Sequence, residues 1–156
     1  MIEGGLYLGD WKAASKLYFL ENMEIGRIIS LGNDQEFEKY IFHDGIEYLK
    51  INVDDTLEED ISKHFAICNE FINNSKTNVL VHCHQGISRS ATIVIAYLMS
   101  KNISFQEAYS QVKSIRPCIK PNDTFLHILK NNLLFLKIIV DSRKREPMRH
   151  QHPCWV

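Results

Sequence analysis

The chain has 156 residues, of which 45% are hydrophobic and 24% charged, and its formal net charge is −1 at pH 7. This length suits one domain with a sizeable core, and the near-neutral charge argues against a nucleic-acid-binding protein. The apolar runs fall far short of the roughly 20 residues that a membrane-spanning helix needs, so we expect no association with a membrane.

Segments of strand type alternate with segments of helical period along the chain. In chain order we predict a strand at 6–8, a helix at 10–20, strands at 27–31 and 47–53, a helix at 57–73, a strand at 78–82, and helices at 91–99, 105–116 and 124–140. Asp10 stands where an N-cap opens the first helix. Two later helices begin at the spacing of a capping box, Thr56-x-x-Glu59 and Ser104-x-x-Glu107.

This order of elements predicts an α/β fold with a central, mostly parallel sheet of four to five strands flanked by helices. The segment 91–99 is apolar on every side, which indicates a helix covered by its neighbours. From Asp141 to Val156 the periodic pattern breaks, so we expect one folded domain over 1–140 and a flexible tail over 141–156. The apolar residues at 133–136 and 138–140 exceed one helix face and are interpreted as extra core or as a homodimer contact.

The cysteines show no pattern of a zinc site, because Cys68, Cys83, Cys118 and Cys154 include no CxxC pair. No secretory signal is visible at the N-terminus, so we expect reduced thiols and a cytoplasmic or nuclear location. His150-x-His152-x-Cys154 offers only three candidate ligands in the expected tail, so we predict no metal.

The most informative segment is His82-Cys83-His84-Gln85-Gly86-Ile87-Ser88-Arg89-Ser90. An apolar run precedes it and a helical segment follows it, so the loop joins a strand to a helix start. Such loops bind anions, because their amide groups converge and the helix dipole adds positive charge. Gly86 permits the tight loop, Ser88 is placed to cap the helix, and Arg89 lies in its first turn. We therefore expect Cys83 to be a thiolate and a nucleophile.

The pattern His-Cys-x5-Arg-Ser resembles the signature of the cysteine-dependent protein tyrosine phosphatase superfamily, and HCHQGISRSAT resembles its small, atypical dual-specificity protein phosphatases. The stretch LYLG at 6–9 also matches that subfamily, as do Arg116-Pro117 and the following Pro121-Asn122 and Phe125. The resemblance spans residues 4–136 and implies a protein tyrosine phosphatase-like catalytic domain over 1–140. His84 and Gln85 depart from it, since small or apolar residues usually follow the nucleophile.

Hydrolysis of a phosphate monoester needs a nucleophile, stabilisation of the equatorial oxygens and a proton for the leaving group. Cys83 is the predicted nucleophile and forms a cysteinyl-phosphate. Arg89 and the loop are predicted to bind the phosphate. The loop residues are His84, Gln85, Gly86, Ile87, Ser88 and Arg89. No cofactor is expected, because the loop dipoles and Arg89 take the electrostatic role of a metal.

The proton donor is expected among the carboxylates that follow the strand at 47–53. Asp54 and Asp55 both lie there, at the same end of the sheet as Cys83. The resemblance assigns the general acid to Asp55, with Asp54 as the alternative. A third possibility is that both are solvated loop carboxylates without a catalytic role.

Four further residues are given supporting roles. Ser90 is expected to hydrogen-bond the departing thiolate, as the resemblance implies. His82 points away from the ligand by strand alternation and is expected to brace the loop. Asn122 either braces the loop, as the family implies, or caps the last helix. His84 lies at the pocket rim as a charge that attracts phosphate or as a solvent-facing bystander.

These observations predict a phosphatase that acts on phosphotyrosine and phosphoserine/threonine in proteins, with a phosphoprotein as its partner. Two alternatives stay open. A phosphoinositide or RNA 5′-phosphatase is one, although the loop has no lysine and carries Ser88 before Arg89. The other is a non-catalytic phosphoprotein-binding pseudophosphatase, although such proteins usually lack one of the key Cys, Arg or Asp residues.

Overall fold

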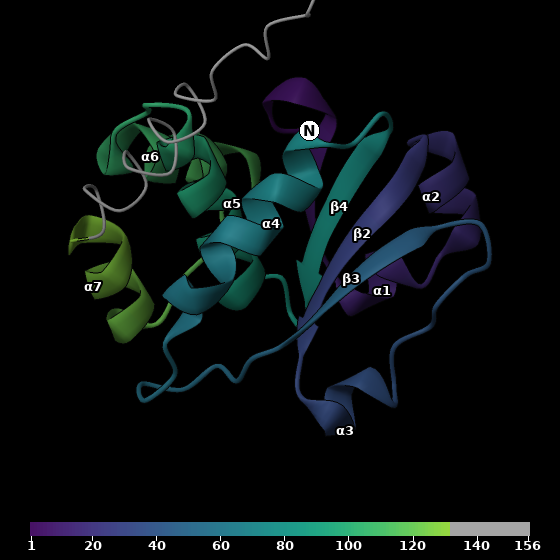
Figure 1. The fold of residues 1–156 in the computed structure, drawn as a ribbon, viewed down its shortest axis with the longest axis horizontal. Helices are drawn as coiled ribbons and strands as arrows, with labels where there is room; N and C mark the ends of the chain where they lie inside the picture. Colours follow the sequence, from purple (N-terminus) through teal and green to yellow (C-terminus); the bar gives the residue numbers. More distant parts are fainter. Residues whose placement is uncertain (132–156) are drawn as a thin grey trace, which may run out of the picture.

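One parallel sheet of four strands forms the centre of the protein in the computed structural model, which describes residues 1–131 (Figure 1). The strands are β1 (Leu6–Asp10), β2 (Ile25–Gly32), β3 (Glu47–Asn52) and β4 (Asn78–Cys83). Their order across the sheet is β1-β4-β2-β3, and every neighbouring pair is parallel. All carboxyl ends therefore lie at one edge, with the end of β4 between those of β1 and β2. The predicted α/β class and all four predicted strands are confirmed.

Helices cover both faces of the sheet. They are α1 (Trp11–Ala14), α2 (Leu17–Asn22), α3 (Asp34–Phe37), α4 (Phe65–Asn73), α5 (Arg89–Ser100), α6 (Phe105–Ile115) and α7 (Asp123–Asn131), with 3-10 turns η1 (Glu3–Gly5) and η2 (Ile61–His64). In Figure 1 the helices α4 to α7 lie on one side of the sheet and α1 and α2 on the other.

Strand alternation divides the apolar side chains of the sheet between two cores. On β4, Val79 and Val81 enter the large core beneath α4 to α7, whereas Leu80 enters the small core beneath α1 and α2. On β2, Ile29 and Ile28 divide in the same way. Burial on both faces explains the continuous apolar runs of these strands.

Helix α5 is the central helix of the large core. All of its residues are buried except Tyr97, as its uniform apolarity predicts. It packs against β1 and β4 of the sheet and against the helices α4, α6 and α7. It begins at Arg89, directly after residues 84–88, which lead from β4. A helix buried along almost its whole length therefore fixes one end of that loop.

Two predicted helices differ from the structure. The segment 10–20 forms two short helices, α1 and α2, with Asp10 as the expected N-cap. The predicted capping box at Thr56 is wrong, because residues 54–60 form a loop and the helical structure begins at Ile61, after an Asp60 cap. The Glu59 carboxylate instead accepts from the amide of Asp54.

Two other capping predictions are confirmed. Ser104 and Glu107 form the predicted box at the start of α6. Asn122 caps α7 by accepting from the amide of Phe125. The remainder of the helix predicted to residue 140, the predicted dimer contact and the predicted tail lie outside the described residues. Within residues 1–131, every helix is too short or too polar to cross a bilayer.

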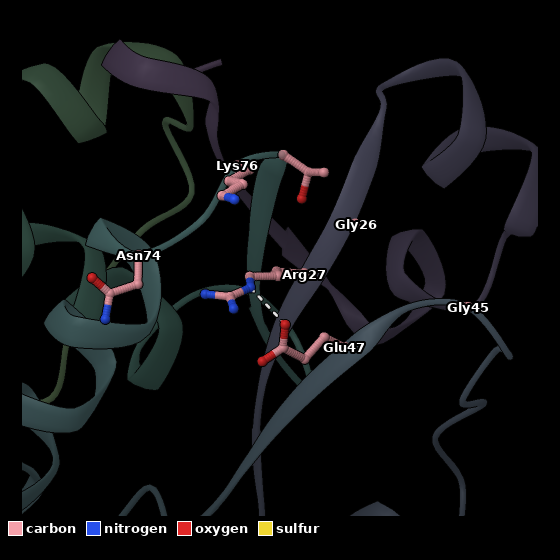
Figure 2. Close-up of a pocket in the computed structure, with 7 residues that line it drawn as sticks. Gly26, Arg27, Gly45, Glu47, Asn74 and Lys76 are labelled. Carbon is pink, nitrogen blue, oxygen red and sulfur yellow. Dashed lines mark hydrogen bonds and ion pairs between the residues drawn. The ribbon is translucent and has the colours of Figure 1, made fainter.

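At the edge opposite the carboxyl ends, a cleft of about 340 Å³ opens beside the starts of β2 and β3 (Figure 2). Arg27 crosses it and pairs with Glu47 on the neighbouring strand at 2.7 Å. The guanidinium also donates to the carbonyl of Phe71 and lies over its ring. These contacts attach α4 to the sheet, so the cleft is bounded by a structural ion pair.

Candidate active site

Cys83 ends β4 at the centre of the carboxyl edge of the sheet, and residues 84–88 lead from it to α5. We call residues 83–89 the signature loop. The Sγ atom accepts from the amide of Gly86 at 3.3 Å and lies 3.2 Å from the hydroxyl of Ser90. Cys83 is only 2% exposed, but its sulfur faces polar donors. Among residues 1–131 no donor contacts the sulfur of Cys68, and burial raises the pKa of its thiol to about 12.

The carbonyl groups of residues 83–88 all accept hydrogen bonds from outside the signature loop. Their donors are His82 Nδ1 to Cys83 at 3.2 Å, Trp11 N to His84 at 3.3 Å, Arg116 Nη2 to Gln85 at 3.2 Å, Arg116 Nε to Gly86 at 2.8 Å, Lys120 N to Ile87 at 2.8 Å and Thr92 N to Ser88 at 2.9 Å.

The N–H and C=O groups of one peptide plane point in opposite directions, so outward carbonyls direct the loop amides inward. Gly86 N is aimed at the sulfur. The amides of His84, Gln85, Ile87 and Ser88 meet no acceptor among residues 1–131. The loop therefore presents a concave set of free donors above Cys83, which is the geometry of an anion site.

One edge of the Arg89 guanidinium binds protein groups, and the other edge faces this concavity. Its two η nitrogens donate to the carboxylate of Glu36 at 2.5 and 2.8 Å, and Nη1 also donates to the carbonyl of Val53 at 3.1 Å. Its Nε is buried without a partner in the described residues. The edge formed by Nε and Nη2 is therefore left for a second bidentate ligand such as phosphate.

The charges of this pair support each other. Burial is the largest single influence on both groups and opposes their charged forms, but hydrogen bonds and charge attraction together outweigh it. The pKa of Arg89 is consequently raised and the pKa of Glu36 lowered from their ordinary values. Glu36 thus keeps Arg89 charged and oriented in a site where it is only 6% exposed.

The structure separates the two candidate proton donors. Asp55 Oδ1 accepts from the hydroxyl of Ser88 at 2.8 Å and from Nδ2 of Asn122 at 2.9 Å, so this carboxylate adjoins the signature loop. Its Oδ2 has no hydrogen-bond partner among residues 1–131. Asp54 instead accepts from the amide group of Asn33 at 2.9 Å, beside α3. The placement favours Asp55.

Asn122 joins three segments around Asp55. Its backbone amide donates to the Ser88 hydroxyl at 3.0 Å, and its side chain also donates to the carbonyl of Thr56. Its Oδ1 caps α7. The expectation that the Ser88 side chain caps α5 is wrong, because this hydroxyl is engaged by Asp55 and Asn122 instead. Loop bracing and helix capping, posed as alternatives for Asn122, coexist in the geometry.

His82 lies behind the loop in a buried chain of hydrogen bonds. Its Nδ1 must donate to the Cys83 carbonyl, because a carbonyl only accepts. Burial lowers the pKa of His82 to about 4, so the ring is neutral and Nε2 is an acceptor. The hydroxyl of Ser30 therefore donates to it at 2.7 Å, and the ring of Tyr40 packs against its face.

His84 and Gln85 lie at the outer side of the loop. The His84 ring stacks on Trp11 with centroids 6.0 Å apart, and its Nδ1 is buried without a partner among residues 1–131. Gln85 is exposed. His84 is half-buried against an aromatic ring, which differs from the solvent-facing position considered for it.

Sequence reasoning missed three residues of this site. Glu36 had a signal, because Asn33-x-x-Glu36 is a capping box, and the structure contains that box at α3. Ser30 had a weaker one, a lone hydroxyl inside the apolar run of β2. Arg116 was noticed only as part of a family motif, and its distance along the chain from the loop gave no sign of its contacts.

A cysteine sulfur beneath inward amides, beside a buried arginine, is the arrangement expected of a cysteine-dependent phosphatase. A sequence model described as "Dual specificity phosphatase, catalytic domain" matches residues 6–132. The chain belongs to the dual-specificity phosphatase family.

Named relatives agree with this assignment. The chain is 42% identical over 125 residues to dual specificity protein phosphatase 15 of Mus musculus, which covers 78% of this chain and 52% of that protein. It is 39% identical over 136 residues to a probable dual specificity protein phosphatase of Dictyostelium discoideum, which covers 85% of this chain and 34% of that protein. The chain therefore spans about a third to a half of the length of these relatives.

Solved structures confirm the fold. The crystal structure of DUSP15 superposes with a TM-score of 0.85 at 33% identity, over 93% of this chain and 94% of that one. A human tyrosine phosphatase-like serine/threonine/tyrosine-interacting protein superposes with a TM-score of 0.82 at 35% identity, over 86% of this chain and 95% of that one. Because the second is described as phosphatase-like and interacting, the residues of the site must decide between catalysis and binding.

Proposed function

We propose that the protein hydrolyses phosphotyrosine and phosphoserine/threonine in phosphoproteins through a cysteinyl-phosphate intermediate. One observation carries the proposal. Cys83 Sγ, the free edge of Arg89 and the free oxygen of Asp55 converge on one loop whose amides point inward. Each is a group that the chemistry requires.

In the first step, the Cys83 sulfur attacks phosphorus while the bond from phosphorus to the leaving oxygen breaks. The loop amides and the Nε/Nη2 edge of Arg89 hold the equatorial oxygens, where donors placed in advance stabilise developing charge. Asp55 gives its proton from Oδ2 to the leaving alkoxide or phenoxide. The products are the free alcohol and a phosphorylated Cys83.

In the second step, water attacks phosphorus and the bond to sulfur breaks. Asp55 takes a proton from that water, which returns the carboxyl to its starting state. The hydroxyl of Ser90, 3.2 Å from Sγ, donates a hydrogen bond to the departing thiolate. No step in this sequence requires a metal ion, because Arg89 and the loop amides supply the positive field.

Turnover assays on a panel of substrates distinguish the proposal from its rivals. The purified protein is incubated with an aryl phosphate, a phosphotyrosine peptide, a phosphothreonine peptide, a phosphoinositide and an RNA 5′-phosphate, with and without vanadate. We expect vanadate-sensitive release of phosphate from the aryl phosphate and both peptides. Turnover of the lipid or RNA alone would support those enzymes, and binding of phosphopeptides without turnover would support a pseudophosphatase.

The physiological partner is proposed to be a phosphoprotein in a reducing compartment, the cytoplasm or the nucleus, because the nucleophilic sulfur acts only while reduced. Capture with Cys83→Ser tests the partner. This substitution leaves the loop and Asp55 in place and removes the thiolate, so bound substrate is retained. Proteins retained by Cys83→Ser and released by vanadate are the expected outcome, and equal retention by a Cys83→Ser/Arg89→Met double variant would argue against recognition through this site.

A further inference from the structure

Arg116 is the C-cap residue that follows α6, and it donates to two consecutive carbonyls of the signature loop. Its Nε donates to Gly86 O at 2.8 Å and its Nη2 to Gln85 O at 3.2 Å. These are charge-assisted bonds from the planar fork of a single guanidinium, a geometry that lysine does not reproduce. Arg116 itself lies outside the concavity and behind the loop.

Each of the two carbonyls belongs to a peptide plane whose N–H group faces the site. The plane with Gln85 O also holds Gly86 N, which donates to the Cys83 sulfur at 3.3 Å. The plane with Gly86 O also holds Ile87 N, one of the inward amides without an acceptor. Holding both carbonyls therefore aims one N–H at the nucleophile and the next at the position of a bound phosphate.

The position of Arg116 is itself fixed from β1. Its Nη2 lies 3.8 Å from Oδ2 of Asp10, and the other oxygen of Asp10 caps α1 by accepting from the amide of Ala13 at 2.9 Å. Asp10 pairs in register with Cys83 across the sheet. The loop, the end of β1 and the end of α6 thus meet at one guanidinium.

We propose that Arg116 is a positioning residue that sets the anion-binding shape of the signature loop from behind, without touching the substrate. Phosphate affinity and the reactivity of Cys83 should both depend on it. The inference rests on the proposed function only in taking the loop as the phosphate site.

The test compares Arg116→Met and Arg116→Lys with the wild type and with Lys113→Met. Lys113 is a matched control, because its Nζ donates to the carbonyl of Ile119 at 2.8 Å in the same segment but does not contact the loop. Three quantities are measured: the dissociation constant of vanadate by calorimetry, the rate of Cys83 alkylation by iodoacetate at pH 7, and the melting temperature.

We expect Arg116→Met to weaken vanadate binding roughly 10-fold or more, as loss of charge-assisted hydrogen bonds implies, and to slow alkylation. Arg116→Lys should fall between Met and wild type, because one donor of the fork can be replaced. Lys113→Met should bind vanadate like the wild type.

Wild-type vanadate affinity and alkylation in a folded Arg116→Met or Arg116→Lys protein would overturn the inference. Equal losses in Lys113→Met would also overturn it, because the effect would then be one of nearby charge or of the segment 116–120. Vanadate binding and alkylation need no turnover. A wild-type protein without phosphatase activity would therefore count against the proposed function alone.

Discussion

At the scale of single residues, the main feature of the site is that its charged side chains are held by protein groups on one side and left free on the other. Arg89 donates from its η nitrogens to Glu36, and its Nε has no partner in the described part of the chain. Asp55 accepts from Ser88 and Asn122 through Oδ1, and its Oδ2 has no partner there. Each group is thus oriented before a ligand arrives, which is the condition for effective electrostatic catalysis.

Replacing Asp55 by Asn should separate proton donation from binding. The amide oxygen of Asn can still accept from Ser88 and Asn122, but the side chain carries no acidic proton. We expect turnover to fall by about 10²–10⁴-fold, with vanadate affinity unchanged. The fall should be largest for aryl phosphates with the most basic leaving groups, measured as kcat across a series. An equal fall for all leaving groups would argue against Asp55 as the acid.

Replacing Glu36 by Gln should loosen Arg89. The neutral side chain keeps the shape but leaves a buried guanidinium without its counter-charge, so we expect the free energy of unfolding to drop by roughly 2 kcal/mol at pH 7 and kcat/KM to fall at least 10-fold.

The pH dependence has a definite sign for this pair. The pKa of Glu36 in the folded protein lies below its ordinary 4.5, so the stabilisation is present above pH 4.5 and is lost as the pH falls through the folded value. The stability difference between wild type and Glu36→Gln should therefore shrink in acid. A difference that is independent of pH would contradict the role of the charge.

The site residues that lie close together in the sequence were predictable, because their types and spacing form a recognisable motif. Cys83, Arg89 and Ser90 lie within one short segment, and Asp55 follows a strand. Ser30, Glu36 and Arg116 contact that segment from distant parts of the chain. Their contacts depend on the order of strands in the sheet, which no local pattern encodes.

At the scale of elements, the signature loop depends on close backbone approach. Gly86 has φ +67°, and a Cβ there would lie 2.5 Å from the carbonyl oxygen of Gly9 and 2.7 Å from Nη2 of Arg116. A residue with a side chain fits only if both contacts, to β1 and to the guanidinium, are relieved. The glycine is thus required by both conformation and space.

Gly86→Ala should consequently disrupt phosphate binding. We expect vanadate affinity to fall at least 10-fold, because a clash with backbone adds to the cost of about 1 kcal/mol or more for a positive φ. Gly45→Ala is the matched control, since Gly45 has φ +82° but nothing within 4 Å of the position of a Cβ. It should lose some stability and keep wild-type vanadate affinity. Similar vanadate affinities in the two variants would contradict this account.

The helix predicted over 57–73 shows why element boundaries were harder to predict. Thr56 and Glu59 have the spacing of a capping box, but tertiary contacts determine their conformation. The carbonyls of Thr56 and Leu57 accept from Asn122 and Thr124 of the distant α7 region. The segment therefore forms the loop that positions Asp55, and helical structure starts only at Ile61.

At the scale of the whole molecule, buried histidine links stability to pH. Burial lowers the pKa of His82 from 6.5 to about 4, and burial also lowers the pKa of His64. Between pH 6.5 and 4 the imidazole of His82 is protonated in the unfolded chain but neutral in the folded protein. The free energy of unfolding therefore decreases as the pH falls through this window.

We expect the wild type to lose up to roughly 3 kcal/mol of unfolding free energy from His82 alone across that window. Denaturant titrations at pH 7.5, 5.5 and 4.5 measure it. His82→Gln should be less stable than wild type at pH 7.5, and the gap should narrow at acid pH. A gap that widens in acid would mean that His82 is charged in the folded state.

The fold class was predictable because it depends on short-range alternation of strands and helices, which the sequence displays directly. The strand order β1-β4-β2-β3 was not, although it brings Asp10, Ser30 and Cys83 to one edge. Pairing of strands is decided by packing on both faces of the sheet, which involves the whole chain at once.

The link between Asn122 and Asp55 joins residues 67 positions apart in sequence. During synthesis on the ribosome, Cys83, Arg89 and Asp55 all emerge well before Asn122 does. The nascent polypeptide therefore carries the proposed reactive groups while the contact that orients Asp55 is still missing. Full phosphatase activity is expected only after residue 122 has left the exit tunnel.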